Sequence, residues 1–377
     1  MTDFHTILAE ARRRAFSEKD KGTRFERLMQ AFLQTYPPYL GRFTDVWMWS
    51  DFPYRKDFGG KDTGIDLVAR TTDGDYWAVQ CKCYQAASQI TKKDVDTFLA
   101  TSSRTFRDGA GRTTRFAQRL WLSTTDKWNK EAENTIRHQD PPVARIGLGE
   151  LEDAPVDWEK LAAGITGAAA ARRARTPKPH QMEAMDAARA HYAAHDRGKL
   201  IMACGTGKTY TALKIAEQEA GAHGLVLFLV PSIALLGQTL REWSTYAQGA
   251  LDAICVCSDA SASKSTDDAL ESVDLALPAT TDAHLVATRL RQARLRTQPL
   301  PPPLGDKQTH DALASMRSLM PSWLVAPQGA ERVTSSEECG LTVVFFHLPI
   351  HRRHPQGASA PPRHGHARGK SRRHVRL

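Results

Sequence analysis

The sequence predicts an α/β protein with a mixed sheet in its first part, a parallel α/β unit after it and a disordered tail. Three observations support this. "GIDLVARTTDGDYWAVQCKCY" at residues 64–84 has the pattern of a β-hairpin. "LIMACGTGKTYTALKIAEQ" at 200–218 has the strand–turn–helix order of a phosphate-binding loop. Beyond residue 291, Arg, Pro and His dominate, which is typical of disorder.

Length and composition restrict the class of protein. The 377 residues suffice for two domains, and 41% hydrophobic with 25% charged residues is typical of a soluble globular chain. The start is charged, and Pro231 interrupts the longest apolar run, so we expect neither a leader nor a membrane span. The six cysteines show no disulfide or zinc-finger spacing, which favours a reducing cytoplasm.

The net charge of +9 belongs to the tail. Residues 292–377 contain 13 Lys/Arg against 5 Asp/Glu, and the first 291 residues contain 38 against 37. The positive charge is therefore no sign of nucleic-acid binding by the folded part. We divide the chain into a first domain (1–165), a connector that is helical and then a linker (166–179), a second domain (180–290) and the tail (291–377).

The hairpin has a defined register. Residues 72–74 suit a three-residue loop with glycine in the left-handed conformation. That loop pairs Thr71 with Asp75 and places Asp66 opposite Gln80. Because side chains alternate, Asp66, Gln80 and Lys82 share one face with Val68. The opposite face is apolar and carries Ile65, Leu67, Ala69, Trp77, Val79, Cys81 and Cys83.

The flanking segments complete a mixed sheet with helices on its faces. "GTRFERLMQAFLQTY" predicts a helix with one apolar stripe and Glu26 at its edge. That stripe consists of Phe25, Leu28, Met29, Phe32 and Leu33. After the hairpin, "ITKKDVDTFLA" and "WNKEAENTIRH" predict helices, and "RLWLSTT" and "ARIGLGELED" predict strands.

"FERL", "GIDL" and "QCK" occur in order on these elements, and together they resemble the PD-(D/E)xK nucleases, in particular the Mrr-like branch of restriction endonucleases. Most of that superfamily has Asp or Glu where Gln80 stands, and this branch has Gln. The resemblance implies that Asp66, the Gln80 side-chain oxygen and the Cys81 carbonyl bind Mg²⁺ or Mn²⁺, with Glu26 completing the shell. Lys82 would orient or activate water.

A less specific interpretation remains open. Asp66, Gln80 and Lys82 would line a solvated sheet face, where an Asp–Lys pair contributes almost nothing to stability. Cys81 and Cys83 are better explained by core packing than by metal binding.

The second motif predicts a nucleotide site. A strand ending at Met202 would lead into a turn and a helix starting near Lys208. Backbone N–H groups would hold the β-phosphate, Lys208 would reach the β- and γ-phosphates, and Thr209 would hold Mg²⁺. The residues of this loop are Gly205, Thr206, Gly207, Lys208 and Thr209. Met202 stands where the general pattern has its first glycine.

"PKPHQMEAM" before this loop and "GLVLFLVPSIALLGQTLREW" after it resemble the opening motifs of superfamily 2 helicases of the restriction-enzyme kind. The resemblance implies a RecA-like fold in which Gln181 reads adenine and Ser232 and Gln238 lie near the DNA backbone. The alternative for Gln181 is an ordinary helix residue. Residues 241–243 are interpreted as structural.

The helicase resemblance stops near residue 290. No D-E-x-H tetrad follows Thr209, and no second RecA-like domain is found. We therefore expect a truncated or frameshifted front part of a longer polypeptide, with an aberrant tail. ATP would bind weakly, ATPase activity would be lost, and DNA cleavage would need Mg²⁺ but not ATP.

The sequence thus predicts a restriction-endonuclease-like mixed sheet domain followed by a partial RecA-like parallel α/β domain and a disordered tail. Its predicted activity is metal-dependent cleavage of double-stranded DNA, as a dimer or with restriction–modification subunits. The alternatives are a catalytically inactive DNA-binding remnant and an ATP-binding regulator of a restriction–modification system.

Overall fold

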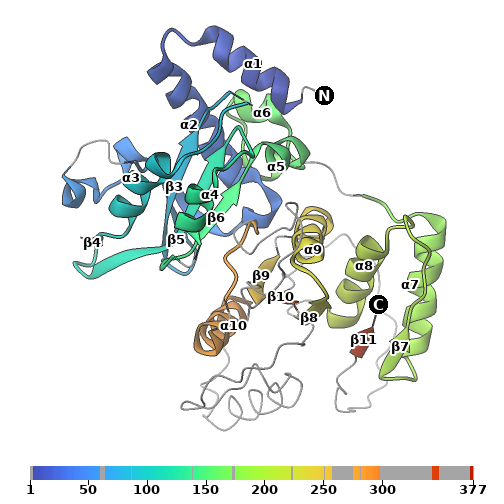
Figure 1. The fold of residues 1–377 in the computed structure, drawn as a ribbon. Helices are drawn as coiled ribbons and strands as arrows, with labels where there is room; N and C mark the ends of the chain where they lie inside the picture. The colour runs from blue at the N-terminus through green and yellow to red at the C-terminus, as the bar shows by residue number, and fades with distance from the viewer. Residues whose placement is uncertain are drawn as a thin grey trace, which may run out of the picture.

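The computed structural model shows two α/β parts that follow each other along the chain (Figure 1). The structure describes residues 3–59, 64–85, 87–137, 139–171, 175–221, 224–249, 251–256, 275–280, 282–297, 342–347 and 374–376. The helices of the first part are α1 (Phe4–Arg14), α2 (Glu18–Thr35), η1 (Pro37–Tyr39), η2 (Trp49–Asp51), η3 (Arg55–Phe58), α3 (Lys92–Ser102), α4 (Lys130–Ile136), α5 (Leu148–Asp153), α6 (Trp158–Ala162) and η4 (Gly167–Ala169). Its strands are β1 (Phe43–Met48), β2 (Leu67–Thr71), β3 (Tyr76–Lys82), β4 (Thr105–Arg107), β5 (Thr113–Ser123) and β6 (Val143–Ile146).

These strands form one mixed sheet. Its order is β1-β2-β3-β5-β4, with β6 also paired to β5. Strand β2 is antiparallel to both β1 and β3, whereas β3 pairs with β5 and β5 with β6 in parallel. The hairpin β2–β3 therefore lies inside the sheet, with neighbours on both sides.

Two apolar clusters cover the two faces of this sheet. Helices α1, α2 and α6 pack against one face, where Leu67, Trp77 and Val79 are buried. The 3-10 helices η2 and η3 and the helices α3 and α4 pack against the other face, where Val68 and Ala78 are buried. The predicted apolar stripe of α2 is buried throughout. Because both faces of the sheet are buried, every polar group inside it needs a hydrogen-bond partner.

The second part contains a further small sheet. Its helices are α7 (Pro179–Tyr192), α8 (Lys208–Ala220), α9 (Ile233–Tyr246) and α10 (Ala283–Thr297). Its strands are β7 (Arg197–Lys199), β8 (Leu225–Val230), β9 (Asp252–Val256), β10 (Thr342–His347) and β11 (His374–Arg376). Strand β10 lies between β8 and β9 and is antiparallel to both, so β8 and β9 run parallel to each other. Strand β11 pairs with β7 in parallel.

Contacts between the two parts are both apolar and polar. The first apolar cluster continues without interruption from α1 and α2 into α8, α9 and β9. Helix α9 packs against η1, and the buried Tyr39 hydroxyl donates to the Ala276 carbonyl at 2.6 Å. Burial raises the pKa of Tyr39 well above its usual value, so this hydroxyl remains a donor. The two parts therefore share one core.

Several expectations differ from the structure. Strand β7 ends at Lys199, and the next residues up to 207 form no strand, with Ile201 81% exposed. "ARIGLGELED" is strand only in β6 and then becomes α5. In the described part of the expected helical connector, only η4 is helical. Ile65 belongs to the cluster on the opposite face from Leu67, because β2 begins only at Leu67 and strict alternation does not extend before it.

The expected tail is described only in small pieces. Strand β10 falls within it and is the middle strand of a sheet, and β11 also falls within it. The other residues beyond 297 lie outside the described ones.

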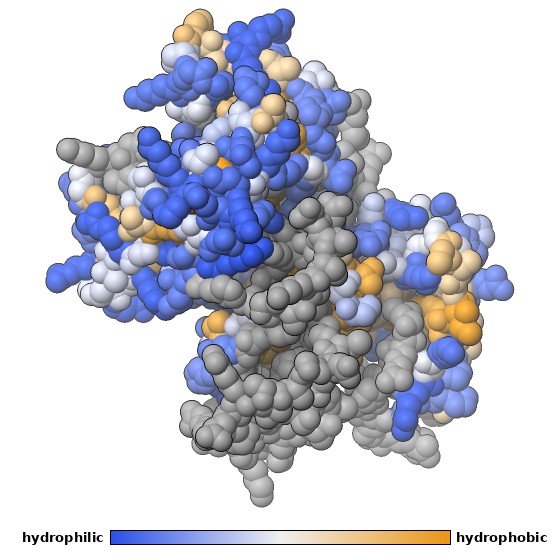
Figure 2. Space-filling model, viewed as in Figure 1, coloured by the Kyte–Doolittle hydropathy of each residue, from blue (hydrophilic) through white to orange (hydrophobic). Residues whose placement is uncertain are grey.

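The surface differs between the two parts. Figure 2 shows mostly hydrophilic colour over the first part and orange patches on the second. Exposed large apolar side chains on the second part are Met182, Ile201, Leu225, Leu227, Leu229, Leu235 and Leu285. Among the described residues, no helix is long and apolar enough to cross a membrane.

One buried cation joins strand β5 to the end of α3 and to the loop before β6. Arg119 of β5 is fully buried and donates to the hydroxyls of Ser102 and Ser103 at 2.6 and 2.7 Å, and to the Pro141 carbonyl. Burial lowers the pKa of Arg119 to about 10, which still leaves the guanidinium charged at neutral pH. It joins the end of α3 to the loop before β6.

We expect Arg119→Ala to lower the free energy of unfolding by about 3 kcal/mol, because it leaves buried hydroxyl and carbonyl groups without their partner. Arg115→Ala on the same strand is the matched control. Its side chain is 61% exposed and pairs with Asp140 at the surface, so about 0.5 kcal/mol or less is expected. Urea denaturation of both variants gives the comparison, and equal losses would contradict the role given to Arg119.

Candidate functional site

The hairpin β2–β3 has the register that the sequence predicts. The Thr71 N–H donates to the Asp75 carbonyl at 2.8 Å, and Gly74 has a φ of 91° in the loop. Leu67 lies opposite Val79, which places the preceding Asp66 opposite Gln80. The register is therefore confirmed.

The carboxylate of Asp66 holds two consecutive residues of β3. Its Oδ2 atom accepts a hydrogen bond from the Cys81 backbone N–H at 2.7 Å and another from Nε2 of Gln80. Its own backbone N–H donates to the Val79 carbonyl at 2.9 Å. Hydrogen bonds to a carboxylate are among the stronger ones in proteins, so the Asp66–Gln80 pair is held in one geometry.

Gln80 is buried. Its side chain is 1% exposed, and it lies on the face opposite Trp77 and Val79. The alternative that this group lines a solvated sheet face is therefore wrong for Gln80. Its amide is instead a buried polar group, and its hydrogen bond to Asp66 meets the requirement for a partner.

The charges of Glu26 and Lys82 both affect the pKa of the Cys81 thiol. Burial raises the pKa of the Cys81 thiol well above its usual value, the charges of Asp66 and Glu26 raise it further, and Lys82 lowers it. Glu26 comes from α2 and Lys82 from the end of β3. Asp66 and Gln80 contact each other beside Cys81, and the charges of Glu26 and Lys82 act on the Cys81 thiol.

Asp94 is influenced by the charge of Lys82, and the sequence analysis did not include it among the site residues. Its carboxylate accepts hydrogen bonds from the Thr91 N–H and hydroxyl at 2.8 and 2.7 Å, forming the cap of α3. Partial burial raises the pKa of Asp94, but the Thr91 hydrogen bonds and the charge of Lys82 outweigh burial and leave it lowered. The sequence signal was present as the capping pattern T-x-x-D at 91–94.

The donor atoms suit a small, hard cation. Asp66 and Gln80 offer a carboxylate and an amide that contact each other through Gln80 Nε2, and the charge of the Glu26 carboxylate acts on the adjacent Cys81. Mg²⁺ retains several waters and needs only one or two carboxylates. Zinc prefers several His or Cys ligands, and in the described part of the chain no three His, Cys, Asp or Glu side chains form a metal-binding group. The residues therefore fit magnesium or manganese.

The phosphate loop has the expected turn and helix but not the expected strand. Helix α8 begins at Lys208, and Gly205 and Gly207 have φ values of 76° and 83°. The Thr206 hydroxyl donates to the Ala203 carbonyl at 2.7 Å. Lys208 Nζ donates to the Met202 carbonyl at 3.4 Å, so this ammonium lies over its own loop.

Gln181 connects the start of α7 to this loop. Its side chain is fully buried, its Oε1 accepts from the Lys178 N–H at 2.9 Å, and its Nε2 donates to the Thr206 carbonyl at 2.9 Å. His180 Nε2 lies 3.1 Å from the same carbonyl. Gln181 is therefore part of the loop's support, and its role in reading adenine stays a prediction.

Helix α9 supplies contacts to Thr209 that the sequence did not indicate. Trp243 Nε1 donates to the Thr209 carbonyl at 3.0 Å. Burial raises the pKa of Glu242, while the charge of Arg175 and a hydrogen bond from Thr209 oppose that rise. A carboxylate thus lies near the residue predicted to hold Mg²⁺. Nothing local in the sequence marks it, because the contact depends on the packing of α8 on α9.

Two family models match the chain. Residues 34–168 match a model described as a restriction endonuclease, and residues 175–297 match one described as the res subunit of a Type III restriction enzyme. A search of curated proteins gave no match. An Mrr-like restriction endonuclease domain followed by a helicase-like domain is therefore confirmed.

One solved structure is similar over most of the chain. The ATP-dependent Type ISP restriction–modification enzyme LlaBIII bound to DNA is similar with 26% identity and a TM-score of 0.59, over 79% of this chain. This chain spans 18% of the length of that enzyme.

Two further restriction endonuclease structures are less similar. The DNA modification-dependent restriction endonuclease AspBHI has 16% identity and a TM-score of 0.26, over 43% of this chain and 36% of its own. The MspJI restriction endonuclease in complex with a 27-mer oligonucleotide has 18% identity and a TM-score of 0.24, over 45% and 37%. At these TM-scores neither likeness says anything about the function of this chain.

The two loop glycines give a matched test of the support by Gln181. A Cβ on Gly207 would lie 2.5 Å from Gln181 Nε2, whereas a Cβ on Gly205 would meet nothing within 4 Å. Both residues have positive φ, so each change to alanine costs about 1 kcal/mol in backbone strain. We expect Gly207→Ala to cost a further 1 kcal/mol or more, roughly, because the buried amide must move. Urea denaturation measures the difference, and equal losses for the two variants would count against the contact.

Proposed function

We propose that the first domain is a metal-dependent endonuclease that cleaves double-stranded DNA, in a restriction enzyme that also carries an ATP-binding helicase-like domain. The observation that carries this proposal is the hydrogen-bonded pair of half-buried Asp66 and buried Gln80, next to Lys82 and with the charge of Glu26 acting on the adjacent Cys81. It lies within the part of the chain that matches a restriction endonuclease model. DNA appears in the name of the LlaBIII structure, which supports DNA as the substrate.

Asp66, Gln80 and Glu26 would hold Mg²⁺ or Mn²⁺, together with the Cys81 carbonyl. A cation bound there would neutralise the scissile phosphate and lower the pKa of an attacking water. The hydrogen bond from the Cys81 N–H would hold the Asp66 carboxylate in position before substrate arrives.

Lys82 has a separate role. Lys82 is the last residue of β3, and its positive charge lowers the pKa of both the Cys81 thiol and the Asp94 carboxyl. There it would stabilise the negative charge that develops on the phosphate and orient the attacking water. Asp94, held by Thr91, is placed to limit the positions of that ammonium.

The helicase-like domain would bind ATP–Mg²⁺ at residues 205–209. The support is the left-handed glycines, the start of α8 at Lys208 and the contact of Gln181 with Thr206. The loss of ATP hydrolysis stays a prediction from the absence of a D-E-x-H tetrad in the sequence, and Glu242 near Thr209 is the carboxylate to examine if turnover is found.

The chemically distinct alternative is a DNA-binding remnant without catalysis, and direct measurement separates it from the nuclease. We expect Lys82→Ala to slow cleavage of duplex DNA in Mg²⁺ by about 100-fold or more, since it removes charge stabilisation made mainly in the transition state. The thermal unfolding curve should change little, because Lys82 is only half-buried at a strand end.

Lys92→Ala is the matched control for that variant. Lys92 is an exposed lysine that pairs with Asp96 along α3, so its loss should leave cleavage unchanged. If the unmodified chain binds duplex DNA and cuts none in either Mg²⁺ or Mn²⁺, the remnant is the correct interpretation.

A further inference from the structure

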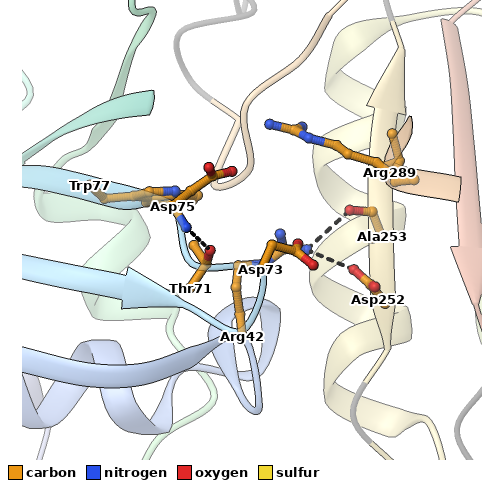
Figure 3. A pocket seen from close by; sticks show the side chains of 9 residues that line it. Arg42, Thr71, Asp73, Asp75, Trp77, Asp252, Ala253 and Arg289 are labelled. Carbon is orange, nitrogen blue, oxygen red and sulfur yellow. Dashed lines mark hydrogen bonds and ion pairs between the residues drawn. The ribbon is translucent and has the colours of Figure 1, made fainter. Parts of the chain in front are cut away.

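The hairpin β2–β3 has two functional ends. Asp66 and Gln80 lie at its open end, and the loop that closes it, residues 72–74, lies against the helicase-like domain. A small polar pocket marks this contact, and Figure 3 shows the hairpin tip facing β9 with Arg289 reaching over it from α10.

Arg42 joins the two domains at this place. Its backbone carbonyl accepts a hydrogen bond from the Thr72 N–H at 2.8 Å, which ties it to the hairpin loop. Its side chain donates to the Ala253 carbonyl at 3.1 Å and to the Asp252 carboxylate at 3.4 Å, both on β9 (Figure 3). One residue therefore contacts the hairpin through its main chain and the helicase-like domain through its side chain.

Both arginine and aspartate side chains surround the hairpin loop at residues 72–74. Burial and the like charge of Arg42 lower the pKa of Arg289, whereas Asp75, Asp73 and Asp252 oppose that shift. Burial raises the pKa of Asp75, and Arg289 opposes it. If one of these partly buried charged side chains is removed, the charges of the others are no longer balanced. We therefore expect these side chains to stay together or to separate together.

Strand β3 connects the two ends stiffly. It is hydrogen-bonded to β2 on one side and to β5 on the other. From Tyr76 to Gln80 it extends about 13 Å, and its pairing with β5 has one irregularity, between Tyr76 and Trp77. A displacement of the tip is therefore carried along β3 to Gln80 and Cys81, whose amide and N–H both bind Asp66.

We propose that Arg42 and Arg289 clamp the tip of the β2–β3 hairpin to β9 and α10, so that the position of the helicase-like domain controls the geometry of Asp66 and Gln80 through the hairpin. The regulatory part of this inference rests on the proposed nuclease function. The mechanical part, the link between the tip and Gln80, does not.

Hydrogen exchange of the full chain tests the mechanical part. Arg42→Glu places a carboxylate against Asp252, and it should speed exchange both at residues 72–75 and at 78–82, by about tenfold or more at Gln80 and Cys81. Asp252→Arg added to Arg42→Glu restores an opposite pair and should return most of that protection. Arg70→Glu, an exposed arginine on β2 of the same hairpin, should leave residues 78–82 unchanged.

Cleavage of duplex DNA by the same proteins tests the regulatory part. We expect Arg42→Glu to slow cleavage by about tenfold and the double variant to recover it. Faster exchange confined to residues 72–75 would overturn the inference. Faster exchange at 78–82 with cleavage at the wild-type rate would overturn its regulatory part.

Two checks keep the result interpretable. If the unmodified chain does not cut DNA, the proposed function fails while the exchange data still decide the mechanical link. If Arg42→Glu does not fold, as judged by circular dichroism, Arg289→Gln removes one charge from the same set and is read in the same way.

Discussion

The first domain depends on one carboxylate that binds two neighbouring residues of the next strand. Asp66 accepts from the backbone of Cys81 and from the side chain of Gln80. Because consecutive side chains point to opposite faces, this fixes which residues of β3 enter each apolar cluster. If β3 slipped by one residue against β2, the Cys81 side chain would face the Asp66 carboxylate. Gln80 would then be buried without its hydrogen-bond partner. The interaction that assembles the site therefore also selects the register of the central strands.

Most of this fold could be predicted from local patterns. The stripe on α2 and the capping box of α3 are encoded within a few residues, and the loop with Gly74 sets the hairpin register. The failures are at segments whose state is decided by distant partners. Residues 200–207 have a strand-like composition, but β7 is short and Ile201 remains exposed. Strand β10 obtains its place from β8 and β9, far away in the sequence.

The residues of the candidate site also divide into those that local patterns predict and those whose place depends on distant contacts. Asp66, Gln80 and Lys82 follow from the register, since the hairpin is a local structure. Glu26 was suggested by its position on a helix edge and by the family resemblance, and its charge raises the pKa of the Cys81 thiol. Asp94 and Arg42 were not singled out and Glu242 was interpreted as structural, because their contacts depend on how helices and strands pack together. Their chemical type is ordinary, and only tertiary structure makes them neighbours of functional groups.

The shared apolar core has a consequence for how such enzymes are rearranged. Chains built from separate modules exchange domains readily when the border is a flexible linker with few contacts across it. Here the Tyr39 hydroxyl reaches the Ala276 carbonyl, and one apolar cluster runs from α2 to α9. A recombination point at the connector would separate surfaces that fit each other and join surfaces that do not. Nuclease and helicase-like segments of this architecture should accordingly be inherited as a pair, with substitutions at one side of the border compensated at the other.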